Sequence, residues 1–265
     1  MNGRPKVYGA LLRHWRERAG LSQLDLSLAA DVSARHLSCL ETGRAQPSRQ
    51  MVLRLGHALD VSLRDRNQML RASGHATVFD EPDAYNLRDD QVVHALDVML
   101  RHHEPFPMLV LDRAYGVVRT NQATMRLARA CDAAMPERWN GLEAFFDPAL
   151  MRPHLLDWQA TARHALARLH LEVLQSPEER RLQALLDRIL AFPGVREEFR
   201  HPNPSTGSAG VLAVRFRVKE QTLSFLVTIS AFQAPQNVTL NELRIESYLP
   251  ADADTEAACR ALLSS

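Results

Sequence analysis

Short runs of apolar residues at helical spacing follow one another from Tyr8 to Ser73, with brief turns between them. The pattern predicts five helices, at about residues 7–19, 23–30, 34–42, 48–59 and 63–72. Ser22 and Ser33 stand at the expected starts of the second and third helices, where a hydroxyl can accept a free amide proton of the first turn. We therefore expect residues 1–75 to form an all-α domain of five helices.

The apolar positions also predict which faces of the two central helices turn inward. On the second helix Leu24, Leu28 and Ala29 recur along one face, and on the third helix Leu37 and Leu40 do so. With Leu37 and Leu40 in the core, the other side of the third helix is expected to lie on the surface.

A polar stretch at residues 76–94 is interpreted as a linker that lets two domains reorient, and beyond it helix and strand signals mix. Apolar and polar residues alternate over 212–218 and 223–229, and two short strands at 108–112 and 117–120 predict a hairpin. Leu243, Ile245, Ser247 and Leu249 mark a fifth strand. Helices are expected at about residues 90–103, 122–130, 141–146, 154–175, 177–191 and 255–263. Residues 95–265 therefore predict an α+β domain with a five-stranded antiparallel sheet.

A net charge of +1 over 265 residues would disfavour nucleic acid as a partner, but the charges are placed unevenly. Residues 1–75 hold twelve Lys and Arg against six Asp and Glu, a net charge of +6, so the other residues carry −5. Because a field acts where its charges lie, DNA is expected to contact the basic part, while the acidic part is repelled by the duplex.

The three cysteines, Cys39, Cys131 and Cys259, share no metal-ligand or redox spacing. We interpret them as thiols in a reducing cytoplasm. The longest apolar runs are far too short to span a bilayer, so no membrane partner is expected.

A dense motif joins the second, third and fourth predicted helices, at Leu21-Ser22-Gln23, Leu28-Ala29, Val32-Ser33, Leu37-Ser38, Glu41, Gly43 and Pro47-Ser48. It resembles the helix-turn-helix of the phage-repressor-like Xre family over about residues 7–72, which implies a bacterial regulator that binds double-stranded DNA. Asp31 departs from the family, which usually has glycine in this turn. Because Asp tolerates a left-handed backbone, the turn is expected to survive.

The outward side of the third helix carries the candidates for reading bases. A helix fits the major groove, and Arg35 is the best candidate to read a guanine because its planar fork can bond O6 and N7 together. Ser33 and Ala34 lie at the helix N-terminus, where the family places base contacts. Ser38 and Cys39 share the outward face.

Three further residues are candidates for contacting the phosphate strand. Gln23 matches a family position that clamps a phosphate, and Arg44 and Arg49 flank the turn into the fourth helix. A single head of this kind makes about four or five phosphate contacts, too few for tight specific binding at physiological salt. The protein is therefore expected to bind a palindromic operator as a homodimer.

The second domain carries three weaker motifs, namely Val110-Leu111-Asp112-Arg113 with Val117-Val118 and Asn121, Asn140-Gly141-Leu142 with Phe145-Phe146-Asp147-Pro148, and Asp157-Trp158 before a long helix. Together they resemble the ligand-binding domain of MmyB-like transcription regulators, a PAS-like fold. The resemblance implies a small apolar, fatty-acid-like ligand between sheet and helices. Two departures bear on what a pocket would accept: Thr120 replaces an aromatic residue, and Arg215 and Arg217 interrupt a late strand.

Seven residues are the candidates for holding such a ligand: Asn121, Phe145, Phe146, Trp158, Phe216, Phe225 and Val227. The apolar members of this set would fill an ordinary core equally well. The residues alone therefore leave open whether a pocket exists.

Catalysis is not expected, because the sequence has no nucleophile elbow, no phosphate-cradling glycine loop and no paired metal-binding histidines. No cofactor or metal is predicted. The favoured interpretation is a transcriptional regulator in which a ligand in the second domain modulates operator binding. Two alternatives stay open: an antitoxin-like repressor whose second domain only binds proteins, and a redox or haem sensor that uses Cys131 or a histidine.

Overall fold

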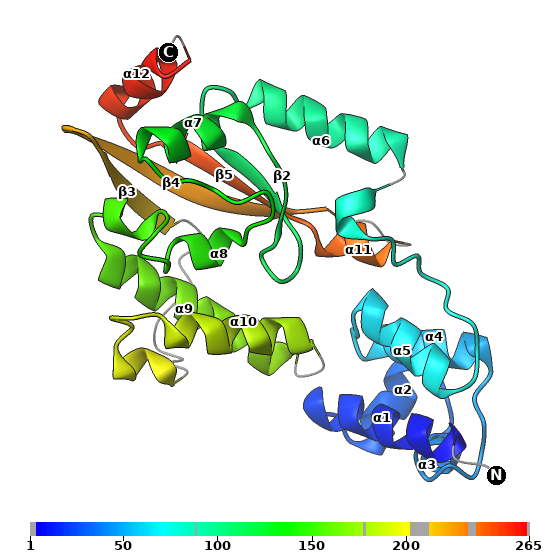
Figure 1. The fold of residues 1–265 in the computed structure, drawn as a ribbon. Helices are drawn as coiled ribbons and strands as arrows, with labels where there is room; N and C mark the ends of the chain where they lie inside the picture. Colours follow the sequence, from blue (N-terminus) through cyan, green and yellow to red (C-terminus); the bar gives the residue numbers. More distant parts are fainter. Residues whose placement is uncertain (1–3, 88, 177–178, 202–211, 233–236, 264–265) are drawn as a thin grey trace. The chain divides into compact units, whose positions relative to one another are not determined.

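The computed structural model describes residues 4–87, 89–176, 179–201, 212–232 and 237–263, and it divides into two compact units (Figure 1). Unit 1 contains the described residues up to Pro82 together with residues 237–241. Unit 2 contains the described residues from Asp83 to Phe232 and from Glu242 onward. The boundary falls inside the stretch that was interpreted as a linker.

Unit 1 is helical, as predicted. Its five main helices are α1 (Arg4–Arg18), α2 (Gln23–Ala29), α3 (Ala34–Glu41), α4 (Arg49–Ala58) and α5 (Leu63–Ala72). Ser22, Ser33 and Ser48 cap α2, α3 and α4, each side chain accepting a backbone amide proton from the first turn. Side chains from every helix meet in one core, whose fully buried members include Tyr8, Leu12, Leu26, Leu37, Leu40, Leu55, Met69 and Leu70.

The inward face predicted for α2 is wrong. Leu24 and Leu28 are 60% and 73% exposed, whereas Leu26 is fully buried and Ala30 nearly so. Two sets of residues with a spacing of four run along this helix, and spacing alone cannot choose between them. Packing against the other helices of unit 1 selects the set that contains Leu26, which lies in the same core as Leu12, Leu37 and Leu55.

The turn between α2 and α3 forms as predicted. Asp31 has a φ of +51°, in the left-handed region, and the Val32 amide donates to the Ser27 carbonyl at 2.9 Å. Asp is among the few non-glycine residues that adopt this conformation at modest cost.

Residues 78–82 are held against α5 by the fully buried Asn67. Its Oδ1 accepts the amides of Val78 and Phe79, both at 3.2 Å, and its Nδ2 donates to the Phe79 carbonyl at 2.8 Å and to Glu81 Oε1 at 2.5 Å. Arg64 forms an ion pair with Glu81 at 3.2 Å. This part of the predicted linker is therefore built into unit 1.

The short helix α11 (Val238–Glu242) meets the same segment from far along the chain. The Val238 amide donates to the Asp80 carbonyl at 2.8 Å, and the Thr239 hydroxyl donates to the Pro82 carbonyl at 2.5 Å. Val238 is 1% exposed. Unit 1 thus includes a segment from between the last two strands of unit 2.

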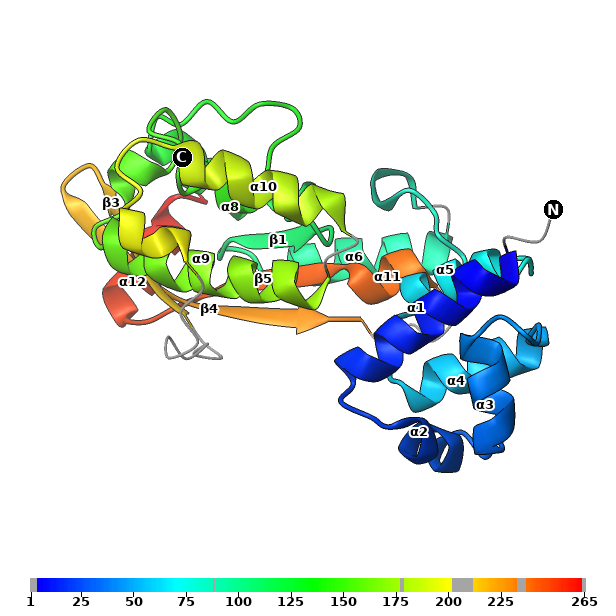
Figure 2. The ribbon, with the colours of Figure 1, turned by 90° about the horizontal axis from the view of Figure 1, so that it is seen from below.

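Unit 2 contains the predicted five-stranded antiparallel sheet, in the order β2-β1-β5-β4-β3. Its strands are β1 (Met108–Leu111), β2 (Val117–Thr120), β3 (Leu212–Val218), β4 (Gln221–Ala231) and β5 (Arg244–Pro250). Its helices are α6 (Asp90–His102), α7 (Gln122–Ala130), α8 (Gly141–Ala144), α9 (Trp158–Gln175), α10 (Arg180–Ala191) and α12 (Ala253–Ala261). The helices α7 to α10 follow the β1–β2 hairpin, as predicted (Figures 1 and 2).

The core of unit 2 lies between the sheet and the helices inserted after β2. A row of aromatic rings crosses the inner face of the sheet, with edge-to-face contacts from Phe145 to Phe216, from Phe216 to Phe225 and from Phe225 to Tyr248. Neighbouring ring centroids are 5.8 to 6.2 Å apart. These contacts hold β3, β4, β5 and the end of α8 together.

The predicted strand β5 is present, and it has buried residues on both faces, with Ile245 3% exposed on one and Tyr248 on the other. Tyr248 is 4% exposed and lies on the inner face, whereas Leu249 is 40% exposed. Pairing with β4 sets this register, because Tyr248 stands opposite Val227 and Glu246 opposite Ile229. Arg244 and Glu246 share the face of Tyr248, so this face of β5 carries polar residues.

Candidate nucleic-acid interface and ligand cavity

Helix α3 presents one side to the surface and the other to the core. Leu37 and Leu40 are fully buried, as predicted, while Ala34 and Arg35 are exposed. Ser33 caps the helix, accepting from the His36 amide at 3.2 Å, and is also exposed. Ser38 and Cys39 are half-buried. The N-terminal turn of α3 is thus its most accessible part.

A buried ion pair fixes the C-terminal end of α3 to α1. Arg16 donates to both carboxylate oxygens of Glu41, from Nε at 2.6 Å and Nη2 at 3.1 Å, and from Nη1 to the Leu21 carbonyl at 2.9 Å. Gln23 Nε2 also donates to Glu41, at 2.8 Å. The side chains of Arg16 and Glu41 are only 11% and 4% exposed. Three helices therefore converge on the Glu41 carboxylate.

Gly9 allows α1 and α3 to approach this closely. A Cβ atom at Gly9 would lie 2.4 Å from the Glu41 carbonyl oxygen and 2.6 Å from that of Leu40, distances that backbone atoms do not tolerate. Sequence reasoning quoted Glu41 as part of the motif but found neither its partner Arg16 nor the role of Gly9. Two signals were present: an arginine and a glycine seven residues apart on one predicted helix.

The candidate phosphate contacts lie at helix starts. Arg49 is the first residue of α4, after its cap Ser48, and Arg44 lies in the turn after α3; both are exposed. In the described part of the chain, no hydrogen bond or ion pair involves the side chain of Arg35, Arg44 or Arg49. Gln23, by contrast, already has one amide proton committed to Glu41.

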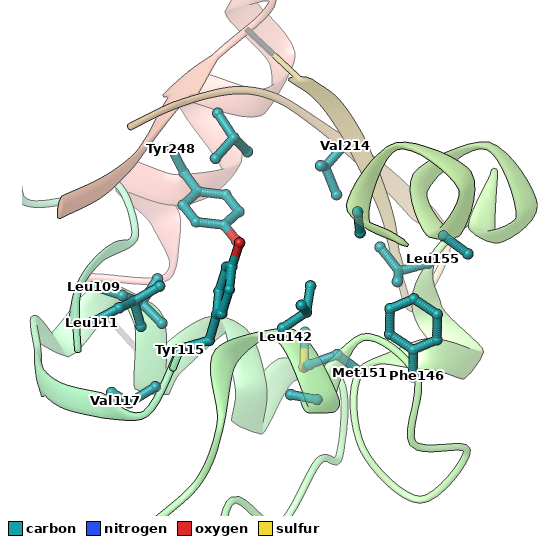
Figure 3. Packing of buried hydrophobic residues seen from close by; sticks show 14 of the residues in the cluster. Leu109, Leu111, Tyr115, Val117, Leu142, Phe146, Met151, Leu155, Val214 and Tyr248 are labelled. Atoms are coloured by element: carbon teal, nitrogen blue, oxygen red, sulfur yellow. The ribbon is translucent and has the colours of Figure 1, made fainter. Parts of the chain in front are cut away.

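Unit 2 contains a cavity of about 90 Å³ between its sheet and helices α8 and α9. Figure 3 shows Tyr115 and Leu142 facing Tyr248 and Val214 across this interior. Its lining residues are Tyr115, Gly141, Leu142, Phe145, Thr161, His164, Ala165, Arg168, Leu212, Val214, Val227, Ile229, Glu246 and Tyr248. Most of the wall is apolar, with charged groups from α9 and β5.

Two arginines and two glutamates gather beside Tyr115, and of these four residues Arg168 and Glu246 line the cavity. Arg168 Nε donates to the Tyr115 hydroxyl at 2.9 Å, which in turn donates to Glu172 Oε1 at 3.0 Å. Arg244 also donates to Glu172, at 3.0 Å, and both guanidinium groups lie over the Tyr115 ring. Burial and the neighbouring Glu172 raise the pKa of Tyr115 to about 12, so its hydroxyl stays protonated.

Glu246 has a different environment from Glu172. Its side chain is 14% exposed and its ion-pair partner is Arg168, 3.5 Å away. Burial raises the pKa of Glu246 above its ordinary value, against the attraction of Arg168 and Arg244.

The seven candidate ligand residues fall into three groups. Phe145 and Val227 line the cavity. Phe146, Trp158, Phe216 and Phe225 lie in the surrounding core and pack on one another. Asn121 lies elsewhere: it caps α7, and its amide bonds the Met108 amide and the Phe106 carbonyl. It therefore shapes the β1–β2 hairpin and does not reach the cavity.

Sequence reasoning missed the polar lining residues Tyr115, Arg168, Glu246 and Tyr248. Tyr115 sits in a hairpin turn with a φ of +64°, and the others lie on elements whose partners are distant in sequence. One signal in the sequence could have found some of them. Alternate residues of a strand share a face, which places Arg244, Glu246 and Tyr248 of β5 on one face.

Cys131 and Cys259 are buried, and burial raises the pKa of each thiol to about 11. Among the described residues, no group of three or more His, Cys, Asp or Glu side chains is arranged to hold a metal ion. No helix in the described part of the chain combines the length and apolarity needed to cross a bilayer.

Residues 92–262 match a family model described as the MmyB-like transcription regulator ligand binding domain, and residues 7–69 match one described as a helix-turn-helix domain. Among solved structures, the chain is similar to the clp gene regulator ClgR from C. glutamicum. The two are 34% identical over 27% of this chain and 88% of that chain, with a TM-score of 0.24. No curated protein matches the chain.

Proposed function

The chain belongs to the MmyB-like transcription regulator ligand binding domain family, and from this premise we propose that it binds a specific operator as a homodimer under the control of a small apolar ligand. That it is a DNA-binding transcription regulator follows from the two domain matches together. The single observation that carries the finer proposal is that unit 1 presents a helix-turn-helix while unit 2 contains a cavity between its sheet and its helices.

We propose that α3 enters the major groove with its N-terminal turn foremost. Arg35 would read a guanine edge, and Ser33, Ala34, Ser38 and Cys39 would contact neighbouring bases. The exposure of Ala34 and Arg35 supports this role. The buried Arg16–Glu41 pair would supply the rigidity that base reading requires, because it ties α3 to α1.

The phosphate strand would be held by Arg44, Arg49 and Gln23. Arg44 and Arg49 are exposed cations beside the turn into α4. The amide of Gln23 has a second proton to donate to a phosphate while the first stays on Glu41. These few contacts per head are the reason for proposing a homodimer on a palindromic site.

In unit 2 we propose that the cavity takes an apolar, fatty-acid-like chain. A cavity of about 90 Å³ is well below the ~300 to 1,000 Å³ of ordinary small-molecule pockets. A ligand large enough to fill an ordinary pocket would therefore push the walls of this cavity apart as it enters. The filled and empty states would then differ in packing, which is what a ligand needs in order to shift a conformational equilibrium.

The proposed route to the DNA runs along β4 and β5. Both strands line the cavity, through Val227 and Ile229 of β4 and through Glu246 and Tyr248 of β5. The chain between them provides α11, whose bonds to residues 80 and 82 are part of unit 1. The chain thus passes between the units three times. A shift of β4 against β5 would therefore move the ends of α11 and, through its hydrogen bonds, residues 80 and 82 of unit 1.

The DNA role is tested by two substitutions and a matched control, with operators selected from random duplexes. Arg35→Ala should cost about 1 to 3 kcal/mol on the preferred base and relax the preference at one position of each half-site. Arg44→Ala should weaken binding on all sequences alike and reduce the salt dependence. Arg13→Ala, an exposed arginine of α1, should change neither. Equal losses for all three on every DNA would contradict the proposal.

The ligand role is tested by native mass spectrometry of freshly purified full-length protein. A bound apolar molecule is the expected result. Protein that never carries or binds a small molecule would favour a second domain that only binds proteins. Absorbance beyond the aromatic band would favour a haem or redox sensor, an interpretation that the buried, protonated thiols of Cys131 and Cys259 already disfavour.

We further propose that the protein works in a bacterial cytoplasm. The three cysteines are unpaired, which suits a reducing compartment.

A further inference from the structure

The geometry points to a ligand whose polar head is uncharged and donates a hydrogen bond to Glu246, such as a long-chain alcohol or primary amide, in preference to the corresponding carboxylate. This inference rests on the proposed function, because it concerns the head group of the molecule in the same cavity. Three features of the cavity wall carry it.

The first feature is the position of Glu246. It stands on β5 opposite Ile229 of β4, and both residues line the cavity. Its side chain is 14% exposed, and the Arg168 guanidinium at 3.5 Å is its ion-pair partner. A carboxylate removed from water needs donors for its remaining lone pairs. An O–H or N–H group on the ligand would supply one from the cavity side.

The second feature is the charge balance of the group of side chains around Tyr115, two of which line the cavity. Arg168 and Arg244 oppose Glu172 and Glu246, so the four charges sum to zero before any ligand enters. A carboxylate entering beside Glu246 would leave one anion without a counter-charge. An ammonium group would leave one cation without a counter-charge. An uncharged head avoids both costs.

The third feature is the set of hydrogen bonds that already joins Arg168, Arg244, Glu172 and Tyr115. Arg168 Nε donates a hydrogen bond to the Tyr115 hydroxyl. Arg244 Nη1 and the Tyr115 hydroxyl both donate to Glu172. A ligand carboxylate could also accept from Arg168, but it has no proton to donate to Glu246. The oxygen of an alcohol or amide can instead accept from Arg168 while its proton goes to Glu246.

The test compares four eight-carbon probes that differ only in the head group. Octan-1-ol, octanamide, octanoate and octylammonium are titrated by calorimetry at pH 8 into the full-length protein. We expect the alcohol and the amide to bind about tenfold or more tightly than either charged probe, since an unpaired buried charge costs well over a factor of ten. This comparison uses only the native protein.

The substitution Glu246→Gln tests the same inference from the side of the protein. The isosteric amide removes the negative charge and leaves the group around Tyr115 with a net charge of +1, so octanoate should gain about tenfold while octan-1-ol changes much less. The control is Glu220→Gln, an exposed glutamate between β3 and β4, which should change neither probe. Thermal unfolding of each variant reports whether it is folded.

The possible failures are distinguishable. Octanoate that binds the native protein as tightly as octan-1-ol and is indifferent to Glu246→Gln would overturn the head-group inference and leave ligand sensing intact. Failure of all four probes to bind would overturn the inference and the ligand part of the proposed function together.

Discussion

Arg16→Ala should destabilise unit 1 far more than the loss of an ordinary surface arginine. The substitution removes both bonds from Arg16 to Glu41, at 2.6 and 3.1 Å, and leaves the nearly buried Glu41 carboxylate with the Gln23 amide as its remaining side-chain donor among the described residues. Breaking a buried pair from one side costs about 3 to 5 kcal/mol, because the surviving charge keeps its burial and loses its partner.

The matched control lies on the same helix. Arg13 pairs with Glu17 at 2.6 Å across one helical turn, with side chains 65% and 52% exposed. Exposed pairs of this spacing contribute about 0.3 to 0.5 kcal/mol. Arg13→Ala therefore removes the same chemical group from α1 at little cost.

Native-state hydrogen exchange of the full-length protein resolves the two units, because peptides from α1 to α3 report the unfolding of unit 1 alone. Arg16→Ala should speed exchange of their most protected amides by about a hundredfold or more, since each 1.4 kcal/mol is a factor of ten. Arg13→Ala should change them by about twofold. Equal effects of the two substitutions would refute the reasoning, as would a double replacement, Arg16→Met with Glu41→Leu, that is no more stable than Arg16→Ala.

Three other predictions follow from burial and hydrogen bonding. Asn67→Ala removes four hydrogen bonds to residues 78–81, so their amides should exchange at least about tenfold faster and the effect of ligand on DNA affinity should shrink; unchanged exchange would contradict the docking of this segment. Phe225→Ala removes the middle of the aromatic row and should lower the free energy of unfolding of unit 2 by about 3 to 5 kcal/mol, measured by denaturant titration, and a loss under 1 kcal/mol would be incompatible with that packing. At pH 8, iodoacetamide should modify the half-buried Cys39 first, because burial shields the thiols of Cys131 and Cys259 and raises the pKa of each to about 11; three equal rates by mass spectrometry would argue against this.

The helices of unit 1 could be predicted because local signals agree there. Serine caps, a glycine at each of several helix ends and short apolar repeats all act within a few residues. The error on α2 shows the limit of such signals. Leu24 and Leu28 have the spacing of a buried face, but the core selects Leu26 and Ala30, and that choice depends on helices elsewhere in the chain.

The candidate DNA residues could be named from the motif, whereas the network behind them could not. Arg16 and Glu41 are 25 residues apart, and their meeting depends on the close approach at Gly9. The same holds for the polar wall of the cavity, where Tyr115, Arg168 and Glu246 come from a turn, a helix and a strand. Long-range pairing brings such residues together, and no local pattern encodes it.

The connection through α11 is the feature for which the sequence offered least. Residues 237–241 lie between two strands of unit 2, so sequence order places them in that domain. Hydrogen bonds to the backbone at positions 80 and 82 instead build them into unit 1. The opposite charges of the two parts of the chain predict where DNA would contact the protein, but they do not indicate that residues 237–241 belong to unit 1.

The central claim is that a ligand in unit 2 changes the DNA affinity of unit 1. The most direct measurement titrates one selected operator with the full-length protein, stripped of its co-purifying apolar molecule and then resupplied with it. The account predicts two separate curves, displaced by about 5- to 150-fold, as a coupling free energy of about 1 to 3 kcal/mol requires. Superimposed curves at saturating ligand would contradict it.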